Sequence, residues 1–286
     1  MQTITELNIY PIKSCGGIRL HEAQLTSSGL RLADGSIGDR EWMLVDVNGQ
    51  FLSQRMYPRM ALITPKLTDS LMELSAPGMA ALEIPIEQPA SSAAPTMDVR
   101  VWRDTVKSWD CGDVAAAWLS GFMSVPCRLV RFHQNASRIA SPKKTGEITA
   151  PMLFNDSFPL LVIGQGSLND LNRRLRNAGR QELPMNRFRP NVVIDGIEPY
   201  EEDRTKSMHF GVTAIRLVHP CQRCPVPSID QVTGLPGPDP LDILKIYRTR
   251  LNGAVVFGMH AIVERGAGSI LKVGQQVDTM SADGQQ

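Results

Sequence analysis

The sequence is poor in cysteine and has no long hydrophobic run. Five cysteines occur in 286 residues, at positions 15, 111, 127, 221 and 224. This number is small and odd, so a disulfide framework of the kind found in secreted modules is excluded. No stretch reaches the ~20 apolar residues that a membrane span requires, and the N-terminus lacks the apolar core of a signal peptide. We therefore expect a protein of the reducing cytoplasm with no membrane span.

An excess of charge of one sign is also missing. The chain has 30 Lys and Arg residues against 29 Asp and Glu residues, a formal net charge of +1, and the two signs are interspersed. A nucleic-acid interface requires clustered basic residues, so we expect no nucleic-acid partner. Hydrophobic residues make up 42% of the chain, which is enough for one large core or two smaller ones.

Short apolar segments separated by turn residues predict a mainly β (α+β) protein. Strands are expected at residues 4–10, 42–47 and 60–64, and Asn48-Gly49 predicts a hairpin turn. We find no alternation of strands and helices of the βαβ type. A β-barrel-like architecture is therefore favoured over a parallel sheet.

Two helices and a division into domains are also expected. One helix should follow Asp113 as its N-cap, and a second should begin at Ser167, where Ser167 and Asp170 resemble a capping box. The polar connection that follows the first helix suggests a β-barrel-like N-terminal domain over residues 1–125 and a second domain with a few helices over residues 126–286.

The most informative motif is Cys221-Gln222-Arg223-Cys224. Such a pair can supply half of a zinc site, perform dithiol redox chemistry, or give one thiolate to a softer metal. A zinc site needs two further ligands, and only His219 is close in the sequence. A dithiol oxidoreductase would need a thioredoxin-like βαβ setting that the sequence does not offer.

Four further segments place polar residues at the expected ends of strands, where binding residues concentrate. They are residues 10–17, 38–42, 155–159 and 187–191. The first contains a Gly16-Gly17 turn whose backbone N–H groups could face an anion. In the second, Arg40 stands just ahead of a strand and is either a binding residue or part of an exposed ion pair with Asp39.

Together these segments resemble the MOSC family, in the group that includes the mitochondrial amidoxime reducing component and its bacterial relatives. The landmarks occur in family order along nearly the whole chain. They are Tyr-Pro-x-Lys-Ser at 10–14, Asp-Arg-x-Trp at 39–42, Phe-Arg-Pro-Asn at 188–191, Glu-Glu-Asp at 201–203, Cys-x-Arg-Cys at 221–224 and Pro-Leu-x-x-Leu-Lys-x-Tyr-Arg at 240–248. The resemblance implies a MOSC N-terminal β-barrel domain followed by a MOSC domain.

The resemblance also implies a molybdenum cofactor (molybdopterin), with Cys224 as the protein ligand of the metal. Cys221 would lie nearby without binding the metal, and Arg223 would help to keep the Cys224 thiol ionised. Asp156 matches an acidic residue near the metal and could pass protons. The implied phosphate ligands are Lys13, Ser14 and Arg40, and the implied contacts of the pterin and its linker are Ser157, Arg189 and Asn191.

The implied activity is reduction of N-hydroxylated compounds such as amidoximes, hydroxylamines and N-hydroxylated bases. The chain has no cysteine cluster for iron–sulfur binding and no Gly-x-Gly-x-x-Gly turn. Electrons should therefore come from a separate flavoprotein or ferredoxin-type protein. The alternative is a molybdenum-cofactor or sulfur carrier without reductase activity. Pyridoxal phosphate binding is not expected.

The chain departs from the family pattern at two places. Phe158 stands where relatives usually carry a small hydroxyl residue, which removes one polar contact to the cofactor. Pro225 and Pro227 follow the second cysteine and should stiffen its loop.

Overall fold

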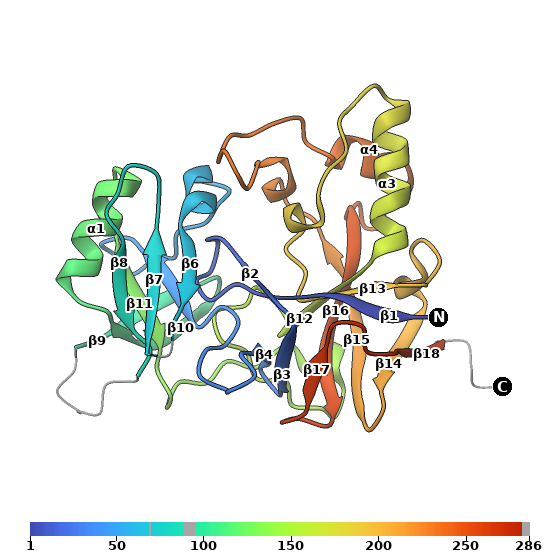
Figure 1. Ribbon diagram of the computed structural model, residues 1–286, viewed down its shortest axis with the longest axis horizontal. Coiled ribbons are helices and arrows are strands. Elements are labelled where there is room, and N and C mark those ends of the chain that lie inside the picture. Colours follow the sequence, from blue (N-terminus) through green and yellow to red (C-terminus); the bar gives the residue numbers. More distant parts are fainter. Residues whose placement is uncertain (69, 88–94, 282–286) are drawn as a thin grey trace.

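The computed structural model describes residues 1–68, 70–87 and 95–281. Most of its elements are strands, so the predicted mainly β class is confirmed. Figure 1 shows two lobes: β6 to β11 and helix α1 form one, and the largest sheet with helices α3 and α4 forms the other. No helix among the described residues is long and apolar enough to cross a membrane.

The largest sheet joins the two ends of the sequence. Strand β1 pairs antiparallel with β13, which follows it by more than 180 residues, in the register Thr3 to Asp195 and Leu7 to Val192. The N-terminal strands therefore belong to the same sheet as the C-terminal ones. The order of this sheet is β18 (Asp278–Ser281), β14 (Thr205–Phe210), β15 (Thr213–Gln222), β16 (Val256–Arg265), β12 (Leu160–Gly164), β13 (Val192–Asp195), β1 (Thr3–Ile9) and β2 (Ile18–Leu20).

Three smaller sheets complete the described β structure. The expected hairpin at Asn48-Gly49 is present, with Gly49 at φ 74° and the Asp46 N–H bonded to the Gln50 carbonyl at 2.9 Å. The sheets are β5 (Trp42–Val45), β11 (Arg128–Phe132), β10 (Asp104–Asp110) and β9 (Thr96–Val101); β17 (Ile270–Lys272), β3 (Glu22–Thr26) and β4 (Gly29–Arg31); and β6 (Thr64–Leu67), β7 (Leu71–Ser75) and β8 (Leu82–Pro85).

The continuous apolar run of β12 is buried on both faces of the sheet. Leu160 and Val162 pack into one hydrophobic cluster, whereas Leu161 and Ile163 pack into a second cluster beneath α3 and α4. The helices are α1 (Asp113–Met123), α2 (Pro142–Thr145), α3 (Gln165–Asn177) and α4 (Leu241–Arg248), and the short 3-10 turns are η1 (Pro58–Leu62), η2 (Met185–Arg187), η3 (Glu201–Asp203) and η4 (Val226–Ser228).

Two expectations about local structure were wrong. Residues 60–62 belong to the 3-10 turn η1 instead of a strand, because Pro58 at its start lacks an N–H and fixes φ for a turn, and the strand β6 begins only at Thr64. A βαβ unit was not expected, yet β12, α3 and the parallel strand β13 form one. The pattern was hidden because a long segment, residues 178–191, separates α3 from β13.

The predicted capping box at Ser167 was also wrong. Helix α3 begins two residues earlier, at Gln165. The Ser167 hydroxyl instead donates to the buried carboxyl of Glu202 at 2.7 Å and accepts the Tyr200 N–H at 2.8 Å. Asp170 pairs with Arg173 and Arg174. Ser167 therefore joins α3 to η3.

We predict that Ser167→Ala destabilises the protein by about 1–3 kcal/mol, because it leaves the Tyr200 N–H and one side of the Glu202 carboxyl without a partner. The free energy of urea unfolding measures this. Ser141→Ala is the matched control, since Ser141 is exposed and makes no cap hydrogen bond. A loss no larger in Ser167→Ala than in the control would contradict this account.

Candidate functional site

A buried carboxylate, Asp39, holds three of the predicted segments together. Asp39 is 1% exposed. Its Oδ1 accepts the Tyr10 N–H at 2.8 Å, and its Oδ2 accepts hydrogen bonds from Arg40 and from the Asn155 amide, the latter at 3.2 Å. The alternative of an exposed Asp39–Arg40 ion pair is therefore wrong. The pair is internal and fixes the position of Arg40.

Three cations, Lys13, Arg40 and Arg189, gather around this carboxylate. The Lys13 ammonium bonds to the Phe154 carbonyl at 2.9 Å and to Asp156. The Arg40 and Arg189 guanidinium groups lie 4.6 and 4.1 Å from the centre of the Tyr10 ring. Burial lowers the pKa of Lys13 and of Arg189, and the nearby Arg40 charge lowers both further.

The cluster has more positive than negative charge. Asp39 and Asp156 are the carboxylates in direct contact with its cations, so within the described residues two negative charges face three positive ones. Arg189 has no carboxylate partner among them: its Nη1 donates to the Cys15 carbonyl at 2.7 Å, and its buried Nη2 has no hydrogen-bond partner. An unpaired buried donor is costly, so this arrangement favours a bound anion.

The backbone at the cluster is also unusual. Six described non-glycine residues have positive φ, and three of them are Ser14 at 69°, Arg40 at 52° and Arg189 at 58°. Such conformations cost roughly 1–3 kcal/mol each and tend to occur at functional sites. All three are residues that the sequence assigned to cofactor binding.

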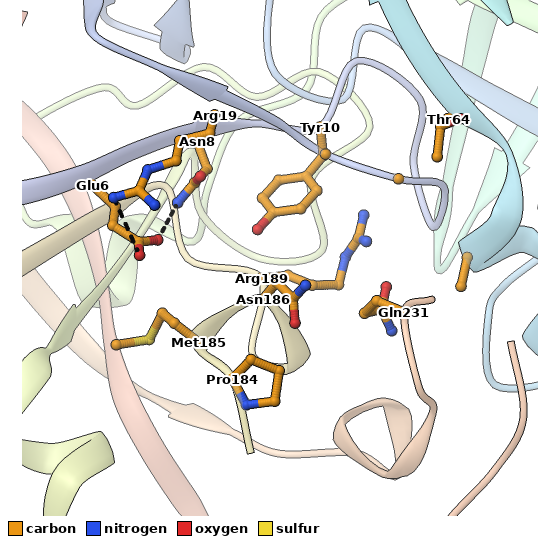
Figure 2. Close-up of a pocket in the computed structure, with 13 residues that line it drawn as sticks. Glu6, Asn8, Tyr10, Arg19, Thr64, Pro184, Met185, Asn186, Arg189 and Gln231 are labelled. Carbon is orange, nitrogen blue, oxygen red and sulfur yellow. Dashed lines mark hydrogen bonds and ion pairs between the residues drawn. The ribbon is translucent and has the colours of Figure 1, made fainter. Parts of the chain in front are cut away.

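A cavity of about 370 Å³ adjoins the cluster and shares Tyr10 and Arg189 with it. Figure 2 shows the Arg189 side chain lying between Tyr10 and Gln231 in this cavity. The other lining residues come from both ends of the chain. They are Glu6, Asn8, Gly16, Gly17, Arg19, Ala61, Thr64, Pro184, Met185 and Asn186.

In the Gly16-Gly17 turn, the Gly16 N–H does not face an anion as expected. The Gly16 N–H already donates to the Ile63 carbonyl at 2.9 Å. At Gly17, a Cβ atom would lie 2.5 Å from the Tyr10 ring. The glycine is therefore explained by the close approach of Tyr10, whose own pKa is raised by burial to about 12 in spite of the two arginines.

The other predicted residues differ in how they are placed. Asn191 is 1% exposed, and its amide oxygen accepts from the Leu161 N–H at 3.1 Å and from Arg40 at 3.3 Å, while its amide nitrogen donates to the Asn8 carbonyl at 3.2 Å. Ser157 is exposed next to Asp156. Asn191 thus orients Arg40 whether or not it also touches a ligand.

The cysteine pair lies at the end of β15, which extends to Gln222. Arg223 does not bond to Cys224 as expected: its Nη1 lies 3.1 Å from the Cys221 sulfur, and its Nη2 donates to the Phe188 carbonyl at 3.0 Å. Burial alone would raise the pKa of Cys221, but His260 and Arg223 lower it to about 6. Cys224 is partly exposed and does not line the cavity.

Two arginines attach the cysteine loop to the segment that carries Arg189. Arg223 binds the Phe188 carbonyl, and Arg187 donates to the Pro227 and Ser228 carbonyls at 3.3 and 3.0 Å. Pro227 and Ser228 are buried. The stiff loop predicted from its prolines is therefore anchored next to residues 187–189.

Sequence reasoning missed Tyr10, Asn155 and Trp102. Tyr10 and Asn155 lie inside the quoted segments, but their contacts with Arg189 and Asp39 need the fold to be seen. Trp102 lies in the turn between β9 and β10, and its indole N–H donates to Asp156 at 2.9 Å. Nothing in the local sequence connects a hairpin turn with an aspartate 54 residues later.

The residues present fit a phosphate-bearing cofactor. The excess positive charge and the unpaired Arg189 N–H suit a phosphate, which arginine binds through parallel hydrogen bonds. The adjoining cavity gives room for an organic group. A thiolate at Cys224 is a soft donor of the type that redox metals accept.

Comparison with known proteins finds two family domains in this chain. The MOSC N-terminal beta barrel domain matches residues 1–126 and the MOSC domain matches residues 149–278. Mitochondrial amidoxime reducing component 2 of Rattus norvegicus is 33% identical over 97% of this chain and 83% of its own, and component 1 of Homo sapiens is 33% identical over 96% and 82%. The molybdenum cofactor sulfurase of Homo sapiens is 32% identical over 96% of this chain but only 32% of its own.

We predict that Arg189→Gln weakens the binding of inorganic phosphate. Loss of a charged hydrogen-bond donor costs about 1.5–3 kcal/mol, which corresponds to a roughly 10- to 150-fold higher Kd. Calorimetric titration of cofactor-free protein measures it, with Arg100→Gln, an exposed arginine of β9, as control. Equal affinity in the two variants would exclude Arg189 from the anion site.

Arg40 is a poorer choice for the same test. Its removal leaves the buried Asp39 carboxylate without its cation, which typically destabilises a protein by about 3–5 kcal/mol. Weaker phosphate binding by Arg40→Ala could then come either from unfolding of the protein or from loss of the arginine–phosphate contact. Arg40→Lys keeps the positive charge but removes the planar guanidinium group. The change in phosphate affinity then measures the contribution of the two parallel hydrogen bonds that an arginine makes to a phosphate.

Proposed function

Because this chain belongs to the MOSC-domain family that includes the mitochondrial amidoxime reducing components, we propose that it is a molybdenum-cofactor-dependent reductase of N-hydroxylated compounds. Amidoximes, hydroxylamines and N-hydroxylated bases are the substrate class. The observation that carries the proposal is the anion cluster, in which Arg189 keeps an unpaired buried N–H beside Lys13 and Arg40. Each of these residues lies in a family motif.

The chain's residues take distinct parts in this proposal. Cys224 would bind the metal as a thiolate, and the bound group would supply two-electron cleavage of the substrate's N–O bond. The resemblance divides the remaining cofactor contacts into a phosphate set of Lys13, Ser14 and Arg40 and a pterin and linker set of Ser157, Arg189 and Asn191. We propose that Arg189 also donates its unpaired N–H to the phosphate.

Asp156 is proposed to handle protons at the mouth of the site. Reduction of an N-hydroxyl group consumes two electrons and two protons and releases water. Desolvation alone would raise the pKa of Asp156, but Lys13, Trp102 and Arg40 hold it well below its usual value, so the group is a carboxylate at neutral pH. Its side chain is 62% exposed, so water reaches it, and the carboxylate would relay a proton from water to the reacting oxygen only transiently, because its lowered pKa disfavours the protonated form.

A carrier of the cofactor or of sulfur is the second candidate. It is favoured by the similarity to molybdenum cofactor sulfurases, whose matching part covers 96% of this chain. A carrier would use the same anion cluster to hold the cofactor. It would differ by lacking turnover of N-hydroxylated substrates.

We predict that Cys224→Ser protein, made in a host that synthesises the cofactor, loses most of its molybdenum and all reductase activity. A serine hydroxyl stays protonated and is a poor ligand for a soft metal. Elemental analysis of the purified protein measures the metal. Cys221→Ser is the matched control and should keep molybdenum, because Cys221 packs with Arg223 in the core. The reverse pattern would exchange the roles of the two cysteines.

The source of electrons gives a further prediction. Reduced viologen should drive reduction of an amidoxime by the molybdenum-loaded chain, whereas NADH should do so only with a flavoprotein or ferredoxin-type partner. Lys143 and Lys144 are exposed on α2, which packs against the cysteine-bearing strand β15, so they could attract an acidic partner. Added salt should then slow the partner-dependent reaction and leave the viologen reaction nearly unchanged.

Two results would change these assignments. Direct turnover with NADH by the purified chain would contradict the need for a separate donor. Failure with viologen, in protein shown to contain molybdenum, would favour the carrier function.

A further inference from the structure

Trp102 has an exposed side chain and a backbone conformation that core packing does not explain. It is 43% exposed, and it adopts φ 57° in the two-residue turn between β9 and β10, a conformation that turns normally assign to glycine or asparagine. Its ring packs against Phe51 with centroids 5.0 Å apart, and the Arg55 guanidinium lies 4.9 Å from its centre. A large exposed aromatic side chain is thus held at a strained position.

The indole of Trp102 points its N–H at Asp156. The same Oδ1 atom accepts the indole N–H at 2.9 Å and a hydrogen bond from the Lys13 ammonium. The Asp156 side chain is 62% exposed, and an exposed ion pair alone holds a carboxylate only weakly. Trp102 is therefore a second restraint, and it comes from the turn between β9 and β10, 54 residues before Asp156 in the sequence.

A bound phosphate would compete with Asp156 for Lys13. Lys13 is buried, and one of its N–H groups is already used by the Phe154 carbonyl. A phosphate beside Lys13 and Arg40 adds negative charge close to the Asp156 carboxylate, which weakens the ion pair. The indole N–H of Trp102 is uncharged, so it keeps its hydrogen bond to Asp156 whether Lys13 binds Asp156 or the phosphate.

We propose that Trp102 is a positioning residue that holds the Asp156 carboxylate at the mouth of the anion cluster when a phosphate group engages Lys13. This inference rests on the proposed function, because it assumes a phosphate-bearing ligand and a proton-handling Asp156. The charged groups around the pair are Lys13 and Arg40 on the cluster side, Arg138 next to Lys13, and Arg55 over the indole.

The first test uses indole NMR on cofactor-free protein with inorganic phosphate as the probe. The chain has four tryptophans, so four indole N–H signals are expected, and Trp102→Phe identifies the one from Trp102. Asp156→Ala should shift that signal toward its solvent-exposed position. Saturating phosphate should leave it in place in the unsubstituted protein. A signal that moves to the solvent-exposed position on phosphate addition would overturn the proposal.

The second test is a double-mutant cycle on phosphate affinity. Trp102 pins a carboxylate near the phosphate, so Trp102→Phe and Asp156→Ala should each strengthen phosphate binding roughly three- to tenfold. The double variant should gain no more than Asp156→Ala alone, because Trp102 acts through Asp156. An equal gain from Trp102→Phe in the Asp156→Ala background would show an independent effect and overturn the proposal.

Trp118→Phe is the matched control, because the Trp118 indole on α1 donates to the Ala80 carbonyl between β7 and β8 and should not affect phosphate binding. The tests need neither molybdenum nor turnover. A protein without reductase activity that passes them would refute only the proposed reaction. An active reductase that fails them would refute only the role of Trp102, and a protein that binds no phosphate would refute the anion cluster on which both depend.

Discussion

The buried Asp39 carboxylate is the interaction on which the site depends. It is almost fully enclosed, and it binds the Tyr10 backbone, the Arg40 guanidinium and the Asn155 amide at once. These groups belong to three segments that are far apart in the sequence. A buried charge must be fully partnered to be tolerated, so the carboxylate requires all three segments to meet at one point. The anion cluster is built around that point.

Within the described residues, one cation of the anion cluster lacks a carboxylate partner. Lys13 and Arg40 each have a carboxylate partner, whereas Arg189 has a carbonyl and the face of Tyr10. Left-handed backbone at Ser14, Arg40 and Arg189 adds strain at the same place. A fold optimised for stability alone would remove both costs. Their joint presence is the physical argument for a ligand that carries negative charge.

Some of the site was within reach of sequence reasoning. Short segments with Pro, Gly and Asn at expected strand ends predicted a mainly β protein and singled out Lys13, Arg40 and Arg189, and the structure brings these three together. Strand and turn preferences are local, so they can be read from neighbouring residues. The same local reasoning failed at residues 60–64 and at Ser167, where Pro58 and the distant Glu202 decide the outcome.

The sequence by itself determined the fold class, the family and the identity of the polar segments, because each depends on residues close together in the chain. The tertiary structure alone decided which partners these residues take. It paired Lys13 with Asp156, gave Arg223 to Cys221 instead of Cys224, and brought the Trp102 turn onto Asp156. Charge pairing depends on distance in space, and Lys13 meets Asp156 because β1 and β2, which flank Lys13, join a sheet whose other strands begin at Leu160.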